Sequence, residues 1–308
     1  MNYDMIVVGG GPAGLTAALY ACRAGKKVLV IEKNVFGGQI TYSPKVENIP
    51  GFREISGNAF AENLVDQVLA QGADVEAGTV VRIENRALKT VVTEDGEFSA
   101  KTVVIATGAR HRLLGLPGEE ALIGNGISFC AVCDGAFFRD RTVAVVGGGN
   151  SALQEALLLA DTAKQVYVVQ NLEMLTGEKR LQQQLRERDN VEILYGTVVS
   201  ALYGKNMLTG VQLRTERDGT LRDLKLDGLF IAIGLEPQNE PFSNLLRLDS
   251  RGYIDAHDTC MTGTDGIFAA GDCRVKKIRQ VTTAASDGAI AALAACDYLD
   301  AWEEKSGN

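Results

Sequence analysis

The sequence predicts an α/β protein made of two nucleotide-binding units, and three observations lead to this fold class. Short apolar runs typical of buried strands alternate with helical patterns along the 308 residues. Two glycine-rich loops, at 9–14 and 147–152, each follow such a run and open a helical pattern. Glycine is abundant (34 residues) and proline is scarce (6 residues), which suits tight strand-to-helix turns. The length allows about two domains.

The composition excludes several classes of function. The formal net charge of −8 argues against a nucleic-acid binder, which needs a basic surface. No apolar run reaches the ~18 residues that a membrane helix requires. The first residues show neither the basic region nor the cleavage site of a signal peptide. We therefore expect a cytoplasmic protein without nucleic-acid or membrane partners.

The first glycine-rich loop predicts a dinucleotide site. Met5–Val8 is typical of a buried strand, and the following GGGPAG at 9–14 fits the pattern G-x-G-x-x-G. A helical pattern from Leu15 to Ala24 comes next, and then a second strand, Lys27–Ile31, with Glu32 after it. In such a unit the glycines let the backbone approach a pyrophosphate, and the helix N-terminus stabilises the phosphate charge. The acid at the end of the second strand accepts hydrogen bonds from a ribose.

Further elements follow the same alternation. The segment 58–71 carries apolar residues on one helical face, and Asp95-Gly96 marks a hairpin turn. The last long helical pattern covers Thr282–Leu299 and follows a strand that closes on Gly271-Asp272. The other predicted elements are strands at Val80–Ile83, Lys89–Thr93, Thr102–Gly108, Thr142–Val146, Gln165–Val169, Val191–Leu194, Val198–Leu202, Thr209–Leu213 and Leu229–Gly234, and a helix at Lys179–Arg188.

Cys130 and Cys133 form a C-x-x-C pair, and Asp134 follows directly. In a reducing compartment such a pair indicates redox chemistry or a metal site. Zinc would need further ligands, but the chain has only two histidines, His111 and His257, and no second C-x-x-C. The residues therefore favour a redox pair and no metal site. They leave open whether the two sulfurs are bonded to each other or reduced to thiols.

The second glycine-rich loop, Gly147–Ala152, keeps the loop pattern but lacks the charges of a nicotinamide site. When the two units are superposed by sequence, the position of Glu32 falls on Gln170. NAD requires an acid there, and NADP requires a nearby cation. The next cations along the chain are Lys179 and Arg180. The unit either serves as a scaffold or binds a nicotinamide cofactor by an unusual route.

Taken together, the motifs resemble one family. GGGPAG with Glu32, GGQI, ENIPG, ATG, CAVCDG, GGGNSA, AIG, GIFAAGDC and RQV occur in the order and rough spacing of the low-molecular-weight thioredoxin reductases. The resemblance covers nearly the whole chain and implies a homodimeric disulfide reductase with non-covalent FAD. It implies two Rossmann-like domains of the three-layer ββα type. The FAD domain would be discontinuous, made of residues 1–111 and 244–308, around a central domain at 112–243 that carries the cysteines.

The resemblance also implies roles for individual residues. Cys130 and Cys133 would be the redox-active pair, and Asp134 the acid that exchanges a proton with it. Asp134 is equally suited to cap a following helix, and both roles are compatible. The residues implied to bind FAD are Gly9, Gly11, Pro12, Ala13, Gly14, Glu32, Lys33, Gly38, Gln39, Asn48, Val80, Ala106, Thr107, Gly108, Gly271, Asp272, Arg279, Gln280 and Val281.

The chain departs from the family in the central domain. NADPH-dependent members carry a basic His-Arg-Arg segment where this chain has Gln170-Asn171-Leu172. This loss resembles the ferredoxin-dependent flavin thioredoxin reductases. It predicts reduced ferredoxin rather than NADPH as the electron donor, and thioredoxin or a thioredoxin-like protein as the acceptor. The alternatives are an NADPH- or NADH-dependent thioredoxin reductase with a divergent nucleotide site, and a flavin-bearing redox sensor without turnover.

A docking surface for an acidic ferredoxin would have to be locally basic, because the whole chain is acidic. Arg274, Lys276, Lys277 and Arg279 lie close together in the sequence, near the position implied for the flavin. We expect this run to be either the docking patch or an ordinary solvated surface.

Overall fold

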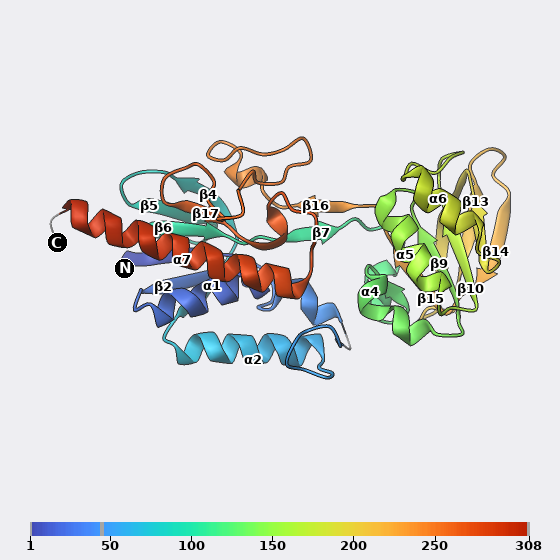
Figure 1. Cartoon of the computed structure of the whole chain (residues 1–308), viewed down its shortest axis with the longest axis horizontal. Helices are drawn as coiled ribbons and strands as arrows, with labels where there is room; N and C mark the ends of the chain where they lie inside the picture. The colour runs from blue at the N-terminus through green and yellow to red at the C-terminus, as the bar shows by residue number, and fades with distance from the viewer. Residues whose placement is uncertain (1, 44–45, 307–308) are drawn as a thin grey trace. The chain divides into compact units, whose positions relative to one another are not determined.

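The computed structural model describes residues 2–43 and 46–306, and these form two compact units (Figure 1). Unit 1 comprises Met1–Pro44, Ile49–Arg110 and Glu236–Asn308. Unit 2 comprises Lys45–Asn48 and His111–Leu235. Unit 1 is thus assembled from separate pieces of the chain. Its last piece begins before residue 244, because Phe242 is buried in the core of this unit.

Unit 1 is built on a seven-stranded sheet with the order β3-β2-β1-β6-β5-β4, and β17 also pairs with β6. Parallel pairing joins β3, β2, β1, β6 and β17, whereas β4, β5 and the first half of β6 pair antiparallel. The strands are β1 (Asn2–Val8), β2 (Val28–Glu32), β3 (Asp74–Ala77), β4 (Val80–Glu84), β5 (Lys89–Thr93), β6 (Glu97–Ile105) and β17 (Ile267–Ala269).

Three long helices cover this sheet: α1 (Pro12–Arg23), α2 (Gly57–Ala70) and α7 (Val281–Ser306). Helix α1 packs against both α7 and α2, as Figure 1 shows. The approach of α7 to α1 is close, because a Cβ on Gly288 would overlap the carbonyl oxygen of Ala13. Short 3-10 turns at Gly38–Tyr42, Glu240–Phe242 and Gly271–Cys273 complete the unit.

Unit 2 repeats this plan. Its parallel sheet has the order β11-β10-β9-β15-β8, and a separate antiparallel sheet has the order β12-β13-β14. The helices are α3 (Glu119–Leu122), α4 (Ala131–Asp134), α5 (Asn150–Ala160) and α6 (Lys179–Arg186), with a 3-10 turn at Gly135–Phe138. The strands are β8 (Ile127–Ser128), β9 (Thr142–Val146), β10 (Gln165–Val169), β11 (Val191–Leu194), β12 (Thr197–Tyr203), β13 (Gly210–Thr215), β14 (Leu221–Lys225) and β15 (Gly228–Ile231).

The predicted α/β class with parallel, Rossmann-like sheets is confirmed. The strands β5, β9, β10 and β11 have the predicted bounds, whereas β3, β7, β8, β14 and β16 were not predicted. Two of these unpredicted strands, β7 (Ala109–His111) and β16 (Leu235–Pro237), pair with each other where the chain passes from one unit to the other. In the described part of the chain, no helix combines the length and the apolar character needed to cross a membrane.

Candidate active site

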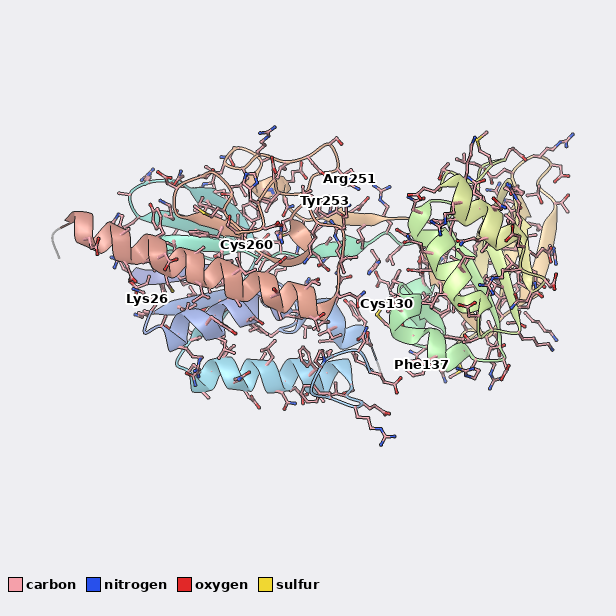
Figure 2. The ribbon with its side chains drawn as sticks, viewed as in Figure 1. Lys26, Cys130, Phe137, Arg251, Tyr253 and Cys260 are labelled. Atoms are coloured by element: carbon pink, nitrogen blue, oxygen red, sulfur yellow. A yellow bond between two sulfur atoms is a disulfide. The ribbon has the colours of Figure 1, made fainter. Side chains whose placement is uncertain are left out.

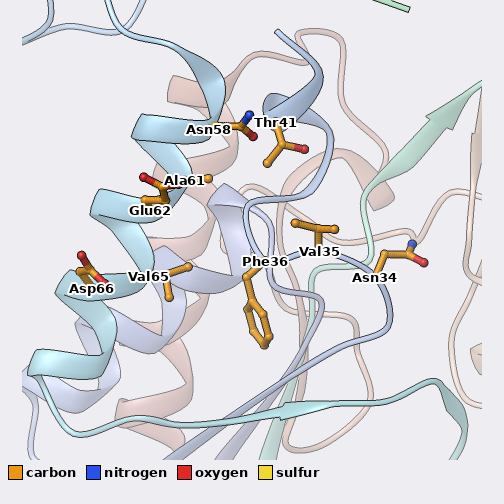
Figure 3. Close-up of a pocket in the computed structure, with 9 residues that line it drawn as sticks. All are labelled: Asn34, Val35, Phe36, Thr41, Asn58, Ala61, Glu62, Val65 and Asp66. Carbon is orange, nitrogen blue, oxygen red and sulfur yellow. The ribbon is translucent and has the colours of Figure 1, made fainter. Parts of the chain in front are cut away.

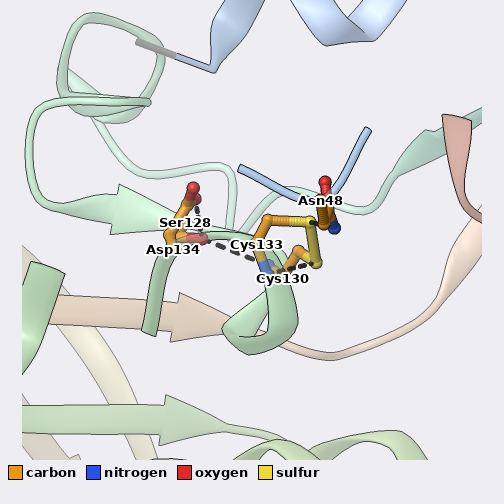
Figure 4. Close-up of a disulfide and its surroundings, with 5 residues drawn as sticks. All are labelled: Asn48, Ser128, Cys130, Cys133 and Asp134. Carbon is orange, nitrogen blue, oxygen red and sulfur yellow. Dashed lines mark hydrogen bonds between the residues drawn. A yellow bond between two sulfur atoms is a disulfide. The ribbon is translucent and has the colours of Figure 1, made fainter. Parts of the chain in front are cut away.

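Cys130 and Cys133 are joined by a disulfide with their Cα atoms 5.3 Å apart (Figure 4). Cys130 is the N-cap of the single-turn helix α4, and its sulfur accepts a hydrogen bond from the Cys133 N–H at 3.2 Å. Both cysteines are partly exposed, and Val132 between them has 64% of its surface exposed. Figure 2 shows Cys130 at the edge of α4 in unit 2. The structure therefore holds the predicted redox pair in its oxidised form.

The Asp134 carboxyl lies beside this pair in a buried environment. Its Oδ2 accepts a hydrogen bond of 2.6 Å from the Ser128 hydroxyl. The same hydroxyl accepts a bond of 3.1 Å from the Cys130 N–H, so Ser128 links Asp134 to the redox pair. Burial raises the pKa of Asp134, and the Ser128 hydrogen bond lowers it by less. A carboxyl that holds its proton more tightly than usual suits proton exchange with sulfur.

Two other side chains frame the cysteines. The Asn48 amide lies 4.0 Å from the Cys133 sulfur, and its segment groups with unit 2. The ring of His111 stacks on that of Phe129, with ring centres 4.5 Å apart. Burial lowers the pKa of His111 to about 4, so this imidazole is neutral at physiological pH. It therefore contributes packing rather than charge next to Cys130.

In unit 1 the first glycine loop forms an open cradle. Gly9 has a φ of 108°, and a Cβ on Gly14 would overlap the carbonyl oxygen of Gly9. A Cβ on Gly38 would lie 3.2 Å from the Cα of Gly11, so these two backbones face each other. The Glu32 carboxylate accepts the Gly10 N–H at 2.7 Å, as an acid in this position can. Pro12 and Ala13 begin α1, whose N-terminus therefore meets the cradle.

The other residues implied for FAD line adjoining turns of unit 1. A Cβ on Gly271 would lie 2.7 Å from the Cβ of Ala13, which places the 271–273 turn against α1. Asp272 follows in this turn, and its buried Oδ1 has no hydrogen-bond partner among the described residues. Burial raises the pKa of Asp272. A buried acceptor of this kind fits a ligand hydroxyl, so the cradle and Asp272 together fit the ribityl and pyrophosphate parts of FAD.

Arg279 lies on the far side of this turn. Its guanidinium sits 4.3 Å from the centre of the Tyr253 ring and donates to the carbonyl oxygen of Lys276 at 3.0 Å. Gln280 and Val281 lead into α7, with the Gln280 N–H donating to Thr283 Oγ1 at 3.2 Å. The helix thus begins beside the same turn that carries Asp272.

The remaining predicted FAD residues are distributed over four places in unit 1. Gln39 donates from its amide to the carbonyl oxygen of Ala109. Thr107 donates to Asn239 Oδ1 at 3.0 Å, in the segment 106–108 that follows β6. Val80 is buried at the start of β4, and the exposed Lys33 follows β2. Of the predicted set, Asn48 is the residue that the structure groups with unit 2 instead.

The sequence left the basic run at 274–279 open as a docking patch or a solvated surface, and the structure buries two of its four cations. The Arg274 guanidinium is buried and donates to both carboxylate oxygens of Asp287, at 2.8 and 2.9 Å. Lys276 donates to the same carboxylate at 2.8 Å and is also buried, with 9% of its side chain exposed. These contacts hold the pKa of Asp287 below its usual value despite its burial. Because one buried carboxylate pairs with both cations, Arg274 and Lys276 are not presented to an acidic partner, whereas Lys277 is exposed and Arg279 is half-buried.

The second glycine loop is hydrogen-bonded to the segment after β10, much as the Gly10 carbonyl of the first loop accepts the Gly37 N–H. Gly147 keeps a φ of 132°, but the Gly148 carbonyl accepts the N–H groups of Thr176 and Gly177 at 2.8 and 2.9 Å. The Asn150 side chain at the start of α5 exchanges two hydrogen bonds with Glu178, at 2.7 and 3.2 Å. Gln170 occupies the position that Glu32 has in unit 1. Its side chain is buried, with 4% of the residue exposed, and its amide donates to the carbonyl oxygen of Met174 at 3.0 Å.

A hollow of about 660 Å³ lies between the loop after β2 and helix α2 (Figure 3). Its lining includes Phe36 and Thr41 from the loop and the acids Glu62 and Asp66 from α2. Two carboxylates disfavour a phosphate. The anionic part of a dinucleotide is therefore better accommodated by the glycine cradle than by this hollow.

Sequence reasoning missed three supporting residues. Asn239 is buried, and its amide donates to the carbonyl oxygens of Gly252 and Cys273 at 2.9 and 2.8 Å, which ties three loops together. No local pattern marks Asn239. Asp287 could have been found, because an acid inside an alanine-rich apolar helix needs a buried partner. Ser128 carries no signal beyond its position two residues before Cys130.

Comparisons with known proteins agree with this architecture. A family model described as pyridine nucleotide-disulphide oxidoreductase matches residues 3–288. A thioredoxin reductase of Treponema pallidum is 40% identical over 97% of this chain and 98% of its own length. One from Bacillus subtilis is 39% identical over 98% of this chain and 96% of its own. The crystal structure of thioredoxin reductase from Streptococcus pyogenes MGAS5005 is 42% identical, with a TM-score of 0.92 over 97% and 99% of the two chains.

Proposed function

The chain belongs to the pyridine nucleotide-disulphide oxidoreductases, and within them to the thioredoxin reductases, and from this premise we propose how it works. Electrons pass through FAD held by unit 1 to the Cys130–Cys133 disulfide, and from there to thioredoxin or a thioredoxin-like protein. The observation that carries this proposal is the disulfide itself. It opens a helix, borders an exposed residue, and lies beside a carboxyl that is linked to it through Ser128.

In this mechanism the residues of unit 1 bind and orient the cofactor. Glycines 9, 11, 14 and 38 leave room for the pyrophosphate against the N-terminus of α1, and Glu32 and Asp272 accept from hydroxyl groups. Bound FAD supplies a two-electron carrier. Residues 1–111 and 244–308 would make up this FAD domain, extended by 236–243 from the division into compact units.

The redox pair acts by thiol–disulfide exchange. In the reduced protein one cysteine thiolate attacks the partner disulfide and forms a mixed disulfide, which the second cysteine then resolves. Asp134 exchanges the proton that the sulfur gains or loses. The chain would work as a homodimer in the cytoplasm; both statements remain predictions from the sequence.

The function can be tested by trapping. Cys130→Ser and Cys133→Ser variants are each incubated with a thioredoxin whose resolving cysteine is replaced. We expect one variant to accumulate the mixed disulfide and the other not to, which identifies the attacking sulfur. A wild-type protein that reduces thioredoxin in a coupled assay excludes a sensor without turnover. Absence of both the adduct and the coupled reduction would contradict the proposal.

For the electron donor we infer reduced ferredoxin rather than NADPH, on observations from unit 2. Glu178, which is hydrogen-bonded to Asn150, places a carboxylate at the start of α5, where a phosphate would bind. The segment Gln170-Asn171-Leu172 offers no cation. The names of the relatives state no donor and lend no support to a ferredoxin-dependent subtype, so NADPH or NADH remains the alternative.

Anaerobic flavin bleaching separates the two donors. We expect bleaching by reduced ferredoxin and none by micromolar NADPH or NADH; rapid bleaching by NADPH would overturn the ferredoxin proposal. A variant combining Gln170→His, Asn171→Arg and Leu172→Arg restores the basic segment of NADPH-dependent members. Gain of NADPH-driven bleaching in this variant, with ferredoxin-driven bleaching unchanged, would locate the cause in this segment.

A further inference from the structure

A second carboxyl group, on the helix that packs against α4, interacts electrostatically with Asp134 in unit 2. Glu155 is in the middle of α5, and its Oε2 is buried without a hydrogen-bond partner among the described residues. The Oδ1 of Asp134 is also buried and also lacks a hydrogen-bond partner among the described residues. Buried polar atoms almost always find partners, so two such oxygens in one region require an explanation.

The packing of α4 on α5 brings these groups to the same place. Ala131 of α4 lies in one apolar cluster with Ala152, Ala156 and Leu159 of α5. A Cβ on Gly135, directly after Asp134, would lie 3.3 Å from Leu159. The absence of a side chain at Gly135 thus lets the end of α4 rest on α5. The apolar surroundings of the buried oxygens, Asp134 Oδ1 and Glu155 Oε2, lower the local dielectric constant and strengthen the interaction between the two carboxyls.

The two carboxyls influence each other electrostatically. Burial, and then the negative charge of Asp134, raise the pKa of Glu155 to about 8. The groups that act on Asp134 are its burial and the Ser128 hydroxyl. Among the described residues no cation acts on either carboxyl to offset this. The pair therefore favours a state with one negative charge rather than two.

We propose that Asp134 and Glu155 form an electrostatically coupled carboxyl pair that carries a single proton behind the Cys130–Cys133 disulfide, with Glu155 as a positioning residue that acts through Asp134. When the S–S bond breaks, its electron pair stays on the leaving sulfur, and that sulfur takes the proton of the pair. In the opposite direction, when a thiol becomes a thiolate to attack a disulfide, the pair receives the proton. This inference rests on the proposed thiol–disulfide exchange, in which a reduced flavin or a dithiol supplies the electrons.

The pair explains why an unpartnered acid occupies α5. Without Glu155, Asp134 would be a single buried acid that must recover its proton from solvent after each transfer. With Glu155, removal of the single proton leaves two interacting negative charges, and their repulsion favours rapid reprotonation. Glu155 thereby keeps Asp134 ready for the next transfer at neutral pH.

The test compares the wild-type holoenzyme with Glu155→Gln, in which the amide resembles the neutral acid but does not titrate. The reduced proteins are alkylated briefly with iodoacetamide across a pH series, and modification is quantified separately at Cys130 and Cys133. For the more reactive cysteine of the wild type, we expect a pH profile with a second inflection near pH 8. Glu155→Gln should lose that inflection and react about threefold faster above it, because the nearby charge no longer disfavours the thiolate.

A second readout does not require the variant to fold like the wild type. Infrared spectra of the oxidised wild-type holoenzyme should contain a protonated-carboxyl band that disappears as the pH passes about 8. Glu187→Gln, at an exposed glutamate that ends α6, is the matched control and should leave both readouts unchanged. A single-step alkylation profile in the wild type, an unchanged profile in Glu155→Gln, or no titrating carboxyl band would each overturn the inference.

Neither readout involves thioredoxin. Loss of thioredoxin reduction with intact pH profiles would therefore contradict the proposed function and leave the carboxyl pair standing. Normal thioredoxin reduction with a featureless pH profile would contradict the carboxyl pair and leave the proposed function standing.

Discussion

The two units carry the same glycine loop on the same kind of parallel sheet, but the residues that follow the second strand differ between them. In unit 1 the acid at the end of β2, Glu32, accepts the Gly10 N–H, and the Gly10 carbonyl accepts the Gly37 N–H at 2.7 Å. In unit 2 the corresponding side chain is the buried amide of Gln170, and Thr176–Glu178 fold back onto Gly148 and Asn150. The loop motif thus specifies a backbone shape, and the residues after the second strand decide what can bind there.

A second contrast concerns the buried acids. Asp287 of unit 1 is fully paired with Arg274, Lys276 and the Gly271 N–H. Glu155 of unit 2 has a buried oxygen without a partner. The paired acid has a lowered pKa and the unpaired acid a raised one. We infer that unit 1 uses its acid to fix a loop, whereas unit 2 keeps its acid available for protons.

The largest effect should come from breaking the ion network of unit 1. Asp287→Asn leaves two buried cations without their carboxylate and should cost about 3–5 kcal/mol of unfolding free energy. Because the folded pKa of Asp287 is lowered, its stabilisation is present above the unfolded value of about 3.9 and is lost as the pH falls through the folded value. Denaturant unfolding of wild type and variant from pH 7 down to pH 3 should show the gap closing.

Glu178→Gln is the control for this experiment. The Glu178 carboxylate is at the surface, where it accepts a hydrogen bond from the Asn150 amide, and has no buried cation as a partner among the described residues. It should change stability by less than about 1 kcal/mol. A stability loss in Asp287→Asn no larger than in this control would show that the network is not what fixes the 271–274 turn.

The next effect uses the third position of each glycine motif. Gly14→Ala adds a Cβ that overlaps the Gly9 carbonyl, so it should cost about 1–3 kcal/mol and lower the amount of flavin bound per chain. The reciprocal change Ala152→Gly, at the equivalent position of unit 2, should cost about 1 kcal/mol and leave flavin content unchanged. Flavin absorbance per polypeptide and thermal unfolding measure both. Equal loss of flavin in the two variants would contradict the proposal that the loop of unit 1, and not that of unit 2, binds the flavin.

Much of the fold could be predicted from the sequence, because apolar periodicity and glycine loops are local signals. The strands Lys89–Thr93 and Val191–Leu194 have the predicted bounds. Strand β8, only two residues long, and the exposed β3 lack such a signal, since their pairing depends on distant strands. The redox pair followed from its spacing together with the resemblance, and its disulfide is present in the structure.

The basic run 274–279 shows where sequence reasoning fails. Its charges are adjacent in sequence, but the acid that neutralises two of them, Asp287, lies within α7 and reaches them only after folding. The same limitation hid Glu155, because nothing in a helical sequence pattern shows that its carboxyl lacks a partner. Pairing of buried charges is a property of the tertiary structure, so a charge count along the chain cannot reveal it.

The smallest effect should come from exchanging the residues after the second strands. Gln170→Glu puts a carboxylate against the Met174 carbonyl in place of a donor, and should cost about 1–2 kcal/mol. Its folded pKa would be raised by burial, so the variant should be nearest to wild-type stability at low pH and lose stability as the pH rises. In unit 1, Glu32→Gln turns an amide donor toward a backbone N–H and should weaken flavin retention by about tenfold.

The two exchanges together decide whether the acid or its surroundings make a nucleotide site. If the acid alone were sufficient, Gln170→Glu would let NADH bleach the flavin. We expect no bleaching, because Glu178 still places a carboxylate at the start of α5, where a phosphate would bind. A variant that adds Glu178→Ala to Gln170→Glu removes this obstacle. Bleaching by NADH in the double variant alone would show that the Glu178 carboxylate, more than the missing acid, closes the second loop.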